Sequence, residues 1–94
     1  MMIDREYSFH SKFNGEWKNL RDLGILDSKV MKDFRSVAER IRKGQSVPAE
    51  YLDHSLHGAL KDCRDFHLRN DIVVMYRVTD SEVEFLRIGR HAQL

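Results

Sequence analysis

Residues 72–88 read IVVMYRVTDSEVEFLRI, and this stretch decides the fold. Ile72–Val78 is almost continuously apolar and rich in β-branched residues, which predicts a central strand. Val83–Ile88 alternates between apolar and polar residues and predicts the next strand. Only a short turn at residues 79–81 separates the two strands, so they are expected to pair antiparallel.

Further strands are predicted on both sides of this hairpin. Leu60–Phe66 alternates loosely, and the turn residues 69–71 that follow it predict another antiparallel pairing, with Ile72–Val78. At the start of the chain, Ile3–Phe9 alternates between apolar and polar residues and predicts a first strand.

The segment between the first strand and the others has helical periodicity. From about Ser11 to Leu23, apolar residues recur at steps of three and four, and Gly24 is a plausible C-terminal stop. A second helix begins at a cap formed by Asp27 or Ser28 and ends at Gly44. One face of this second helix is apolar and consists of Val30, Met31, Phe34, Val37, Ala38 and Ile41.

This order of elements predicts an α+β fold with the arrangement β-α-α-β-β-β. We expect residues 1–94 to form a single domain in which a four-stranded antiparallel sheet carries both N-terminal helices on one face. The other face of the sheet would then be partly open, and a site could be built on it or at its rim. The predicted loop from Gln45 to Gly58 is about as long as an ordered domain tolerates without a functional reason.

Composition excludes several classes of protein. Sixteen Lys and Arg residues against fifteen Asp and Glu residues leave a formal charge of +1, which argues against a polybasic nucleic-acid arm or a membrane-surface patch. Cys63 is the single cysteine, so neither a disulfide within the chain nor a four-thiolate zinc site is possible. We find no apolar run of membrane-spanning length and no signal-peptide core, and we therefore expect a cytoplasmic protein without membrane contact.

Histidines are concentrated late in the chain, where four of the five fall at or after residue 54. His54 and His57 lie in the long loop, and His67 ends the second predicted strand, just across a tight turn from Asp71. Arg87 is expected on the same sheet face as Val83 and Phe85, because alternate residues of a strand share a face. The side chains that could carry chemistry are His54, His57, His67, Asp71 and His91, with Arg64, Arg69, Arg87 and Arg90 around them.

Three chemistries are compatible with these side chains. The His54-x-x-His57 spacing is a weak signal for a metal site, and Cys63 is more typical of a buried strand cysteine than of a nucleophile. The third is metal-independent RNA cleavage, for which histidine suits both proton transfers and arginine suits the phosphate. Each residue also has an ordinary role open to it, since surface arginines usually pair with carboxylates and Asp71 can cap its turn.

Four segments of the C-terminal half carry a family resemblance. They are DHSLHG at 53–58, RDFH at 64–67, DIVVMY at 71–76 and FLRIGRHAQL at 85–94. In order and spacing they resemble the YafQ-like branch of the RelE/ParE toxin superfamily, whose pattern is roughly D-H-x-L-x-G, R-D-x-H, D-x-x-L/V-x-Y and R-x-G-x-H-x-x-L.

The resemblance implies a type II toxin with a RelE-like fold, similar to small microbial ribonucleases. Such a toxin is a ribosome-dependent mRNA endonuclease that needs no cofactor or metal. Its partners would be a cognate antitoxin, mRNA in the ribosomal A site and ribosomal RNA, with a possible higher-order toxin–antitoxin complex. By position, the family's catalytic residues fall on His54, His67, Asp71, Arg87 and His91, while Arg64 and Arg90 are expected to bind substrate.

The resemblance also suggests roles for these residues. His91 would be the general acid and Arg87 the clamp on the transition state, while either His54 or the His67/Asp71 pair would be the general base. Two other functions remain open on the same fold. One is a gyrase-directed ParE-like toxin, although members of that branch generally lack this histidine set, and the other is a catalytically silent regulatory or binding module.

Overall fold

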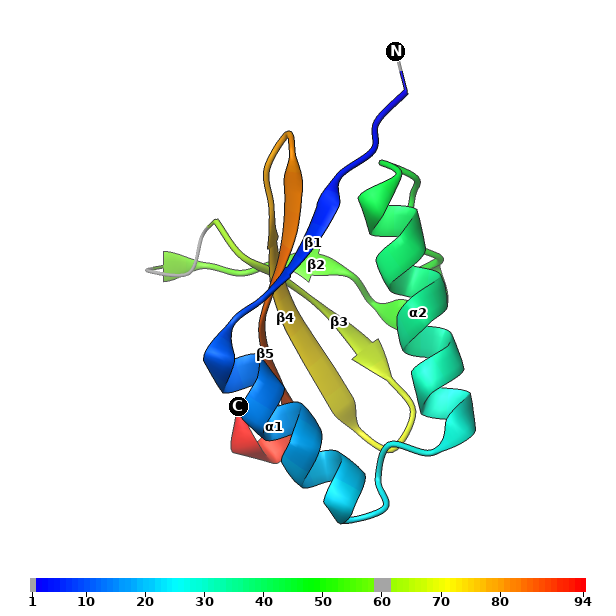
Figure 1. The fold of residues 1–94 in the computed structure, drawn as a ribbon, viewed down its shortest axis with the longest axis vertical. Helices are drawn as coiled ribbons and strands as arrows, with labels where there is room; N and C mark the ends of the chain where they lie inside the picture. Colours follow the sequence, from blue (N-terminus) through cyan, green and yellow to red (C-terminus); the bar gives the residue numbers. More distant parts are fainter. Residues whose placement is uncertain (1, 59–61) are drawn as a thin grey trace.

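The computed structural model describes residues 2–58 and 62–94, and it confirms an α+β protein. None of the helices in these two ranges is long and apolar enough to cross a membrane. Figure 1 shows the elements in chain order: β1 (Glu6–Phe9), α1 (Ser11–Asp22), α2 (Ser28–Arg42), a 3-10 turn η1 (Ala49–Tyr51), β2 (His54–Ser55), β3 (Arg64–Leu68), β4 (Ile72–Val78), β5 (Glu82–Arg90) and a final 3-10 turn η3 (His91–Gln93).

The strands form one mixed sheet in the order β1-β5-β4-β3-β2. The antiparallel pairing of β3 with β4 and of β4 with β5 confirms the prediction from the short turns. The expectation of four antiparallel strands is wrong in two respects. β1 pairs with β5 in parallel, which is possible because two helices, and no tight turn, follow β1. The predicted loop at 45–58 also contains β2, which adds a fifth strand beside β3.

The second predicted strand differs in its bounds. The strand was expected at Leu60–Phe66. Its first two residues, 60 and 61, lie outside the described ranges, and the observed β3 extends to Leu68. The turn into β4 was predicted correctly. Asn70 and Asp71 both have a φ of 61°, as the two central residues of a type I′ hairpin turn require.

Both helices begin and end close to the predicted positions. The Asp27 carboxylate accepts a hydrogen bond from the Val30 N–H at 2.9 Å, so Asp27 is the N-cap of α2. This contact lowers the pKa of the Asp27 carboxyl. Gly24 and Gly44 follow the two helices with positive φ values of 74° and 70°, a conformation that glycine adopts without strain.

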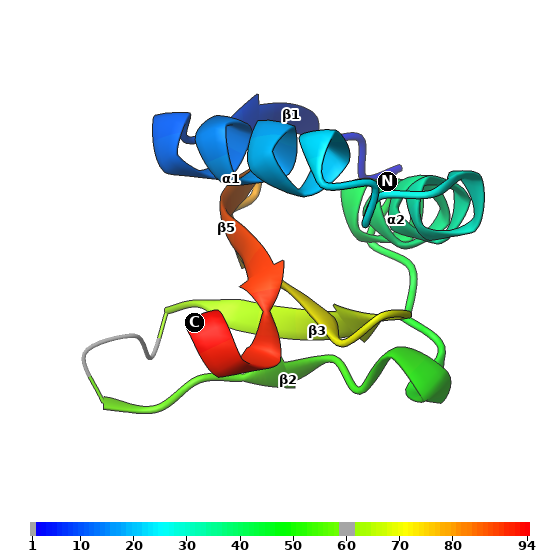
Figure 2. The same ribbon diagram turned by 90° about the horizontal axis from the view of Figure 1, so that it is seen from below.

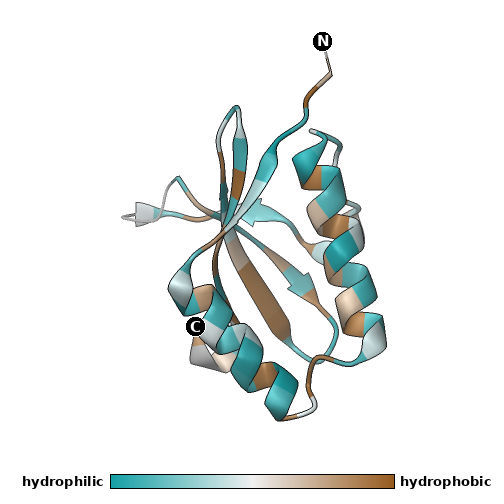
Figure 3. Cartoon of the chain, viewed as in Figure 1, coloured by the Kyte–Doolittle hydropathy of each residue, from teal (hydrophilic) through white to brown (hydrophobic). Residues whose placement is uncertain are grey.

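The core lies between the sheet and the two helices, which cover the same face (Figure 2). Hydrophobic residues are concentrated along β4 and on the helix surfaces turned toward it (Figure 3). Phe85 of β5 is fully buried at the centre of an aromatic cluster, with ring centroids 5.1 Å from Phe34, 5.4 Å from Phe9 and 5.6 Å from Phe13. The sheet therefore has one face in the core and one face free of helices.

A β-bulge in β5 changes which residues reach each face. Tyr76 of β4 lies opposite Phe85, whereas the preceding Met75 lies opposite Arg87, so Leu86 is an extra residue in the pairing. After the bulge Ile88 is buried, and Arg87 is not. The expectation that Arg87 shares a face with Val83 and Phe85 is therefore wrong. Simple alternation fails at the bulge, and Arg87 lies on the helix-free face.

Removing the Phe85 ring is predicted to destabilise the protein strongly. Phe85→Ala would leave a cavity among the aromatic rings and should lower the free energy of unfolding by about 3–5 kcal/mol, a large part of the roughly 5–15 kcal/mol typical of a domain. Phe9→Ala is the matched control, because the Phe9 ring is 45% exposed and should cost much less. Urea denaturation of both variants measures the difference, and equal losses would contradict this description of the core.

Candidate active site

One row of cross-strand neighbours crosses the helix-free face. His54 of β2 lies opposite Asp65 of β3, Asp65 lies opposite Met75 of β4, and Met75 lies opposite Arg87 of β5. Directly opposed residues share a sheet face, so the four side chains lie on one side. His67 follows Asp65 by two residues and belongs to the same face. Strand register therefore gathers residues that are far apart in the sequence.

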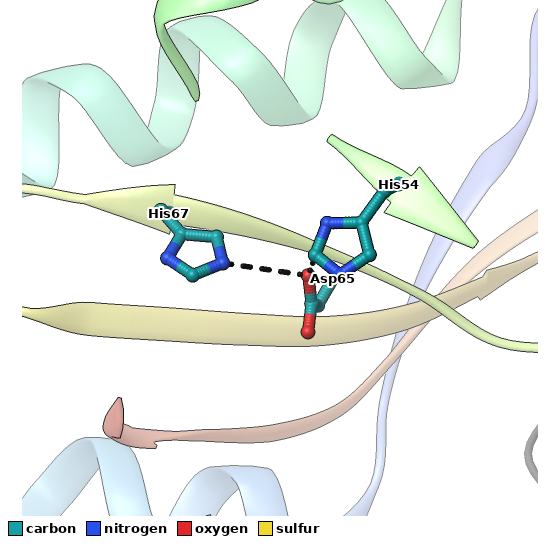
Figure 4. Close-up of side chains that lie close together, drawn as sticks. All are labelled: His54, Asp65 and His67. Atoms are coloured by element: carbon teal, nitrogen blue, oxygen red, sulfur yellow. Dashed lines mark ion pairs between the residues drawn. The ribbon is translucent and has the colours of Figure 1, made fainter. Parts of the chain in front are cut away.

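Asp65 lies between two imidazoles at the centre of this face (Figure 4). Its Oδ1 is 3.1 Å from His54 Nδ1 and 3.6 Å from His67 Nε2, and the two rings have centroids 5.9 Å apart. His54 Nδ1 is also 2.8 Å from the carbonyl oxygen of Leu52. Oδ1 of Asp65 is buried and has no hydrogen-bond partner among the described residues, despite these two nearby nitrogens.

His91 joins the cluster from the C-terminal turn η3. Its backbone N–H donates a hydrogen bond of 2.9 Å to the backbone carbonyl oxygen of Asp71, and its ring centroid lies 5.8 Å from that of His67. The three imidazoles therefore form a row with His67 in the middle. The turn that carries His91 folds back over β5, where a Cβ on Gly89 would come within 3.1 Å of the Leu94 side chain. The lack of a side chain at Gly89 therefore allows this close approach.

Asp71 does not lie where the sequence suggested. The expected partner of His67 was Asp71, just across the tight turn, but the carboxylate beside His67 is that of Asp65. The reason is strand geometry: residues 65 and 67 share a face of β3, whereas Asp71 occupies a left-handed position in the turn itself. Sequence reasoning therefore missed Asp65, although an Asp-x-His pattern on a predicted strand was a signal that could have indicated it.

Arg87 is held by a carboxylate that sequence reasoning also missed. Glu16 of α1 accepts hydrogen bonds from Arg87 Nε at 3.0 Å and from Nη2 at 2.7 Å, and it accepts another from the Ile88 N–H at 3.2 Å. Glu16 raises the pKa of the Arg87 guanidinium. The two residues are 71 positions apart in the sequence, so no local pattern links them.

The remaining predicted residues lie outside this cluster, because register places Arg64 opposite Tyr76 and Arg90 opposite Ile72, on the core side of the sheet. Arg64 Nη2 donates to the Asp53 carboxylate at 2.9 Å, and the buried Tyr76 hydroxyl donates to the same carboxylate at 2.5 Å. Arg90 is exposed at the end of β5, and His57 is exposed beyond β2. Cys63 is buried, as expected for a structural cysteine.

Comparison with known proteins agrees with this architecture. The family described as the bacterial toxin of type II toxin–antitoxin systems, YafQ, matches residues 4–94. The chain belongs to the YafQ toxin family. The resemblance seen in the C-terminal half is therefore confirmed over nearly the whole sequence.

Individual YafQ relatives support the same assignment. The mRNA interferase toxin YafQ of Escherichia coli strain K12 is 44% identical over 93 residues, covering 99% of this chain and 98% of the relative. A copper-bound mutant toxin from Helicobacter pylori superposes with a TM-score of 0.85 at 28% identity, over 96% of this chain and 98% of that chain. The E. coli DinJ–YafQ toxin–antitoxin complex gives a TM-score of 0.81 at 28% identity, over 98% of both chains.

The buried hydrogen bond from Tyr76 predicts a defined alkaline response. Burial first, and then the Asp53 carboxylate, raise the pKa of Tyr76 above its usual value of 10.0. The folded protein then keeps a proton that the unfolded chain loses near pH 10, so stability is present below that pH and falls as the pH rises further. Tyr76→Phe should cost about 1–3 kcal/mol at neutral pH and should make the alkaline decline shallower.

Thermal melts between pH 7 and 11 would measure both effects. Tyr51→Phe provides the comparison, because the Tyr51 hydroxyl makes no hydrogen bond within the described residues and its pKa is raised mainly by burial. An alkaline decline in Tyr76→Phe as steep as that of the wild type would refute the role given to the Tyr76 hydroxyl.

Proposed function

We propose that this YafQ-family toxin is an mRNA interferase, an endoribonuclease that cleaves mRNA on the ribosome through the ribose 2′-OH without a metal ion. The observation that carries the proposal is the convergence of His54, His67 and His91, with consecutive ring centroids 5.9 and 5.8 Å apart, on the face that also presents Arg87. The name of the E. coli relative agrees with this activity.

The cleavage step needs two proton transfers. A base removes the 2′-OH proton, and the ribose oxygen attacks the phosphorus. The bond to the 5′-oxygen then breaks, and an acid protonates that oxygen, which leaves a 2′,3′-cyclic phosphate. Imidazoles suit both transfers because they exchange protons near neutral pH. DNA has no 2′-OH, so this chemistry acts on RNA alone.

Hydrogen bonding supports His54 as the base. A carbonyl oxygen can only accept, so the contact with Leu52 assigns the ring proton to Nδ1 of His54 and leaves the lone pair on Nε2. His91, at the opposite end of the row of imidazoles, then serves as the acid. His67 lies between them beside Asp65, and we assign it to orienting the site and stabilising charge. Asp71 takes part through its carbonyl oxygen, which holds the backbone of His91.

Arg87 is proposed to stabilise the charge that develops on the phosphate. Glu16 occupies its Nε and Nη2, so Nη1 remains for a phosphate oxygen. Arg64 and Arg90 are proposed to contact the RNA backbone away from the reacting phosphate. The net charge of only +1 fits a toxin whose mRNA is presented by the ribosome, since binding to free RNA scales with the phosphates that a protein neutralises.

The cellular setting follows from the same proposal. The DinJ–YafQ complex supports a cognate antitoxin as partner, and further assembly into a larger toxin–antitoxin complex is part of the proposal. The chain would act as a single domain in the cytoplasm, where it meets ribosomal RNA and mRNA in the A site. The histidine cluster favours this function over a gyrase-directed toxin or a silent binding module, neither of which requires three converging imidazoles.

His91→Ala is predicted to abolish the toxic activity. Induced expression of the wild type in a bacterium should stop growth and cut mRNA within reading frames, and loss of the general acid should lower cleavage at least about 100-fold. His57→Ala is the matched control, because this exposed histidine lies outside the cluster and should leave the toxin active. The proposal fails if the well-expressed wild type permits normal growth, or if DNA damage appears without mRNA loss.

Glu16 is predicted to be a positioning residue for Arg87. Glu16→Ala should slow cleavage about 10–100-fold, as loss of a supporting partner typically does. The loss should fall mainly on kcat, because the clamp acts on charge that develops in the transition state. Glu16→Gln keeps an acceptor but loses the charge, so it should be intermediate. A loss of stability with an unchanged kcat would show that Glu16 is only structural, and single-turnover assays with folded protein decide between the two.

A further inference from the structure

The bulge in β5 places two consecutive side chains, Leu86 and Arg87, on the helix-free face. Both are half-buried, whereas Phe85 before them and Ile88 after them are buried in the core. A regular strand cannot do this, because its neighbouring side chains point to opposite faces of the sheet. An apolar side chain therefore lies directly beside the arginine that is proposed to hold the reacting phosphate.

A hollow of about 330 Å³ opens beside this pair and is lined by His10, Lys12, Met75, Leu86 and Arg87. Met75 lies opposite Arg87 in the neighbouring strand β4, and its side chain is half-buried. Met75 and Leu86 thus form an apolar floor, and the other three side chains place nitrogen atoms around it. Because β1 and β2 are the two edges of the sheet, the hollow extends toward the start of α1 and away from the imidazoles of β2 and β3.

His10 is held in a state that leaves one donor available at the hollow. Its backbone N–H donates to the carbonyl oxygen of Phe85 at 2.9 Å, which places His10 beside Leu86. Its Nδ1 accepts a hydrogen bond of 3.1 Å from the Lys12 backbone N–H and caps α1. Because Nδ1 must carry a lone pair for this contact, the ring proton of neutral His10 is on Nε2, which can donate to a ligand.

An apolar floor edged by a lysine, an arginine and an imidazole matches the chemistry of a nucleotide. A nucleobase has a flat apolar face that packs against apolar side chains, including the thioether of methionine. The phosphate carries anionic oxygens that lysine neutralises. We propose that the hollow binds the nucleotide next to the scissile phosphate, with its base on Met75 and Leu86 and the phosphate on its far side contacted by Lys12 and His10. This assignment rests on the proposed function, because Arg87 connects the hollow to the reacting phosphate.

The two parts of the hollow have different consequences for cleavage. Contact with a base depends on which base is present, whereas contact with a phosphate does not. Met75 and Leu86 would therefore influence which mRNA sequences are cut. Lys12 and His10 would strengthen the binding of all sequences alike.

Synthetic mRNAs with an abasic ribose test the contact with the base. The abasic nucleotide replaces, in turn, each of the two nucleotides that flank the scissile phosphate in ribosome-bound mRNA, and it keeps the 2′-OH. At one of these positions, loss of the base should lower the kcat/KM of the wild-type toxin about fivefold or more. Leu86→Ala and Met75→Ala should lower kcat/KM on intact mRNA, and the abasic substitution should then cost each variant at least about twofold less than it costs the wild type.

Lys12→Gln separates the phosphate contact from the base contact. It should lower kcat/KM on intact and abasic mRNA by the same factor, because the lysine does not touch the base. Lys18→Gln is the matched control, since Lys18 is also exposed on α1 but does not line the hollow, and it should cleave like the wild type. Circular dichroism verifies that each variant is folded.

The possible failures are distinguishable. If loss of either flanking base costs the wild type, Leu86→Ala and Met75→Ala the same factor, the nucleotide site is overturned while the proposed nuclease function stands. Unchanged kcat/KM in Lys12→Gln would overturn the phosphate contact. Variants that cleave like the wild type but escape inhibition by the antitoxin would assign the hollow to the antitoxin and overturn the nucleotide site. A wild-type toxin that cuts no intact mRNA would overturn the proposed function, and the nucleotide site with it.

Discussion

The pairing of β4 with β5 is the interaction on which the rest of the structure depends. On the helix side it presents Tyr76 and Phe85 to the core, and on the other side it presents Met75 and Arg87. The bulge at Leu86 allows β5 to place Phe85 in the core and Arg87, two residues later, on the opposite face of the sheet. Because the pairing sets both faces at once, packing in the core and placement of the candidate site share a single cause.

Carboxylates restrain two of the arginines that are proposed to bind RNA. Arg87 is held by Glu16 and Arg64 by Asp53, and both guanidinium groups are partly exposed. Exposed ion pairs add little to stability, so their main consequence is geometric. A guanidinium that is already oriented loses less freedom when it binds a phosphate, and its negative partner also offsets its charge. This arrangement reconciles several arginines that are proposed to contact RNA with a nearly neutral protein.

Much of this architecture could be predicted from local sequence. The periodicity of α2, the apolar run of β4 and the turn at Asn70–Asp71 each specify structure within a few residues, so these predictions were correct. β2 could not be predicted, because two residues carry no pattern and the strand exists only through its pairing with β3. The parallel placement of β1 and the bulge likewise depend on contacts between distant segments. The candidate site shows the same difference between local and long-range information. Its histidines were identified from the sequence, whereas the role of Asp65 depends on strand register and that of Glu16 on the packing of α1 against β5.

The bulge also has a consequence for the way in which the sheet can rearrange. In a regular hairpin, a slip of two residues preserves the alternation of faces and can be tolerated. Here a slip would also move the extra residue of β5 away from the Met75–Tyr76 step, so the bulge would have to form again at another place along β4. The bulge therefore helps to fix the β4–β5 register. The alignment of the side chains on the helix-free face thus depends on an irregularity in the strand pairing as well as on the hydrogen bonds of the sheet.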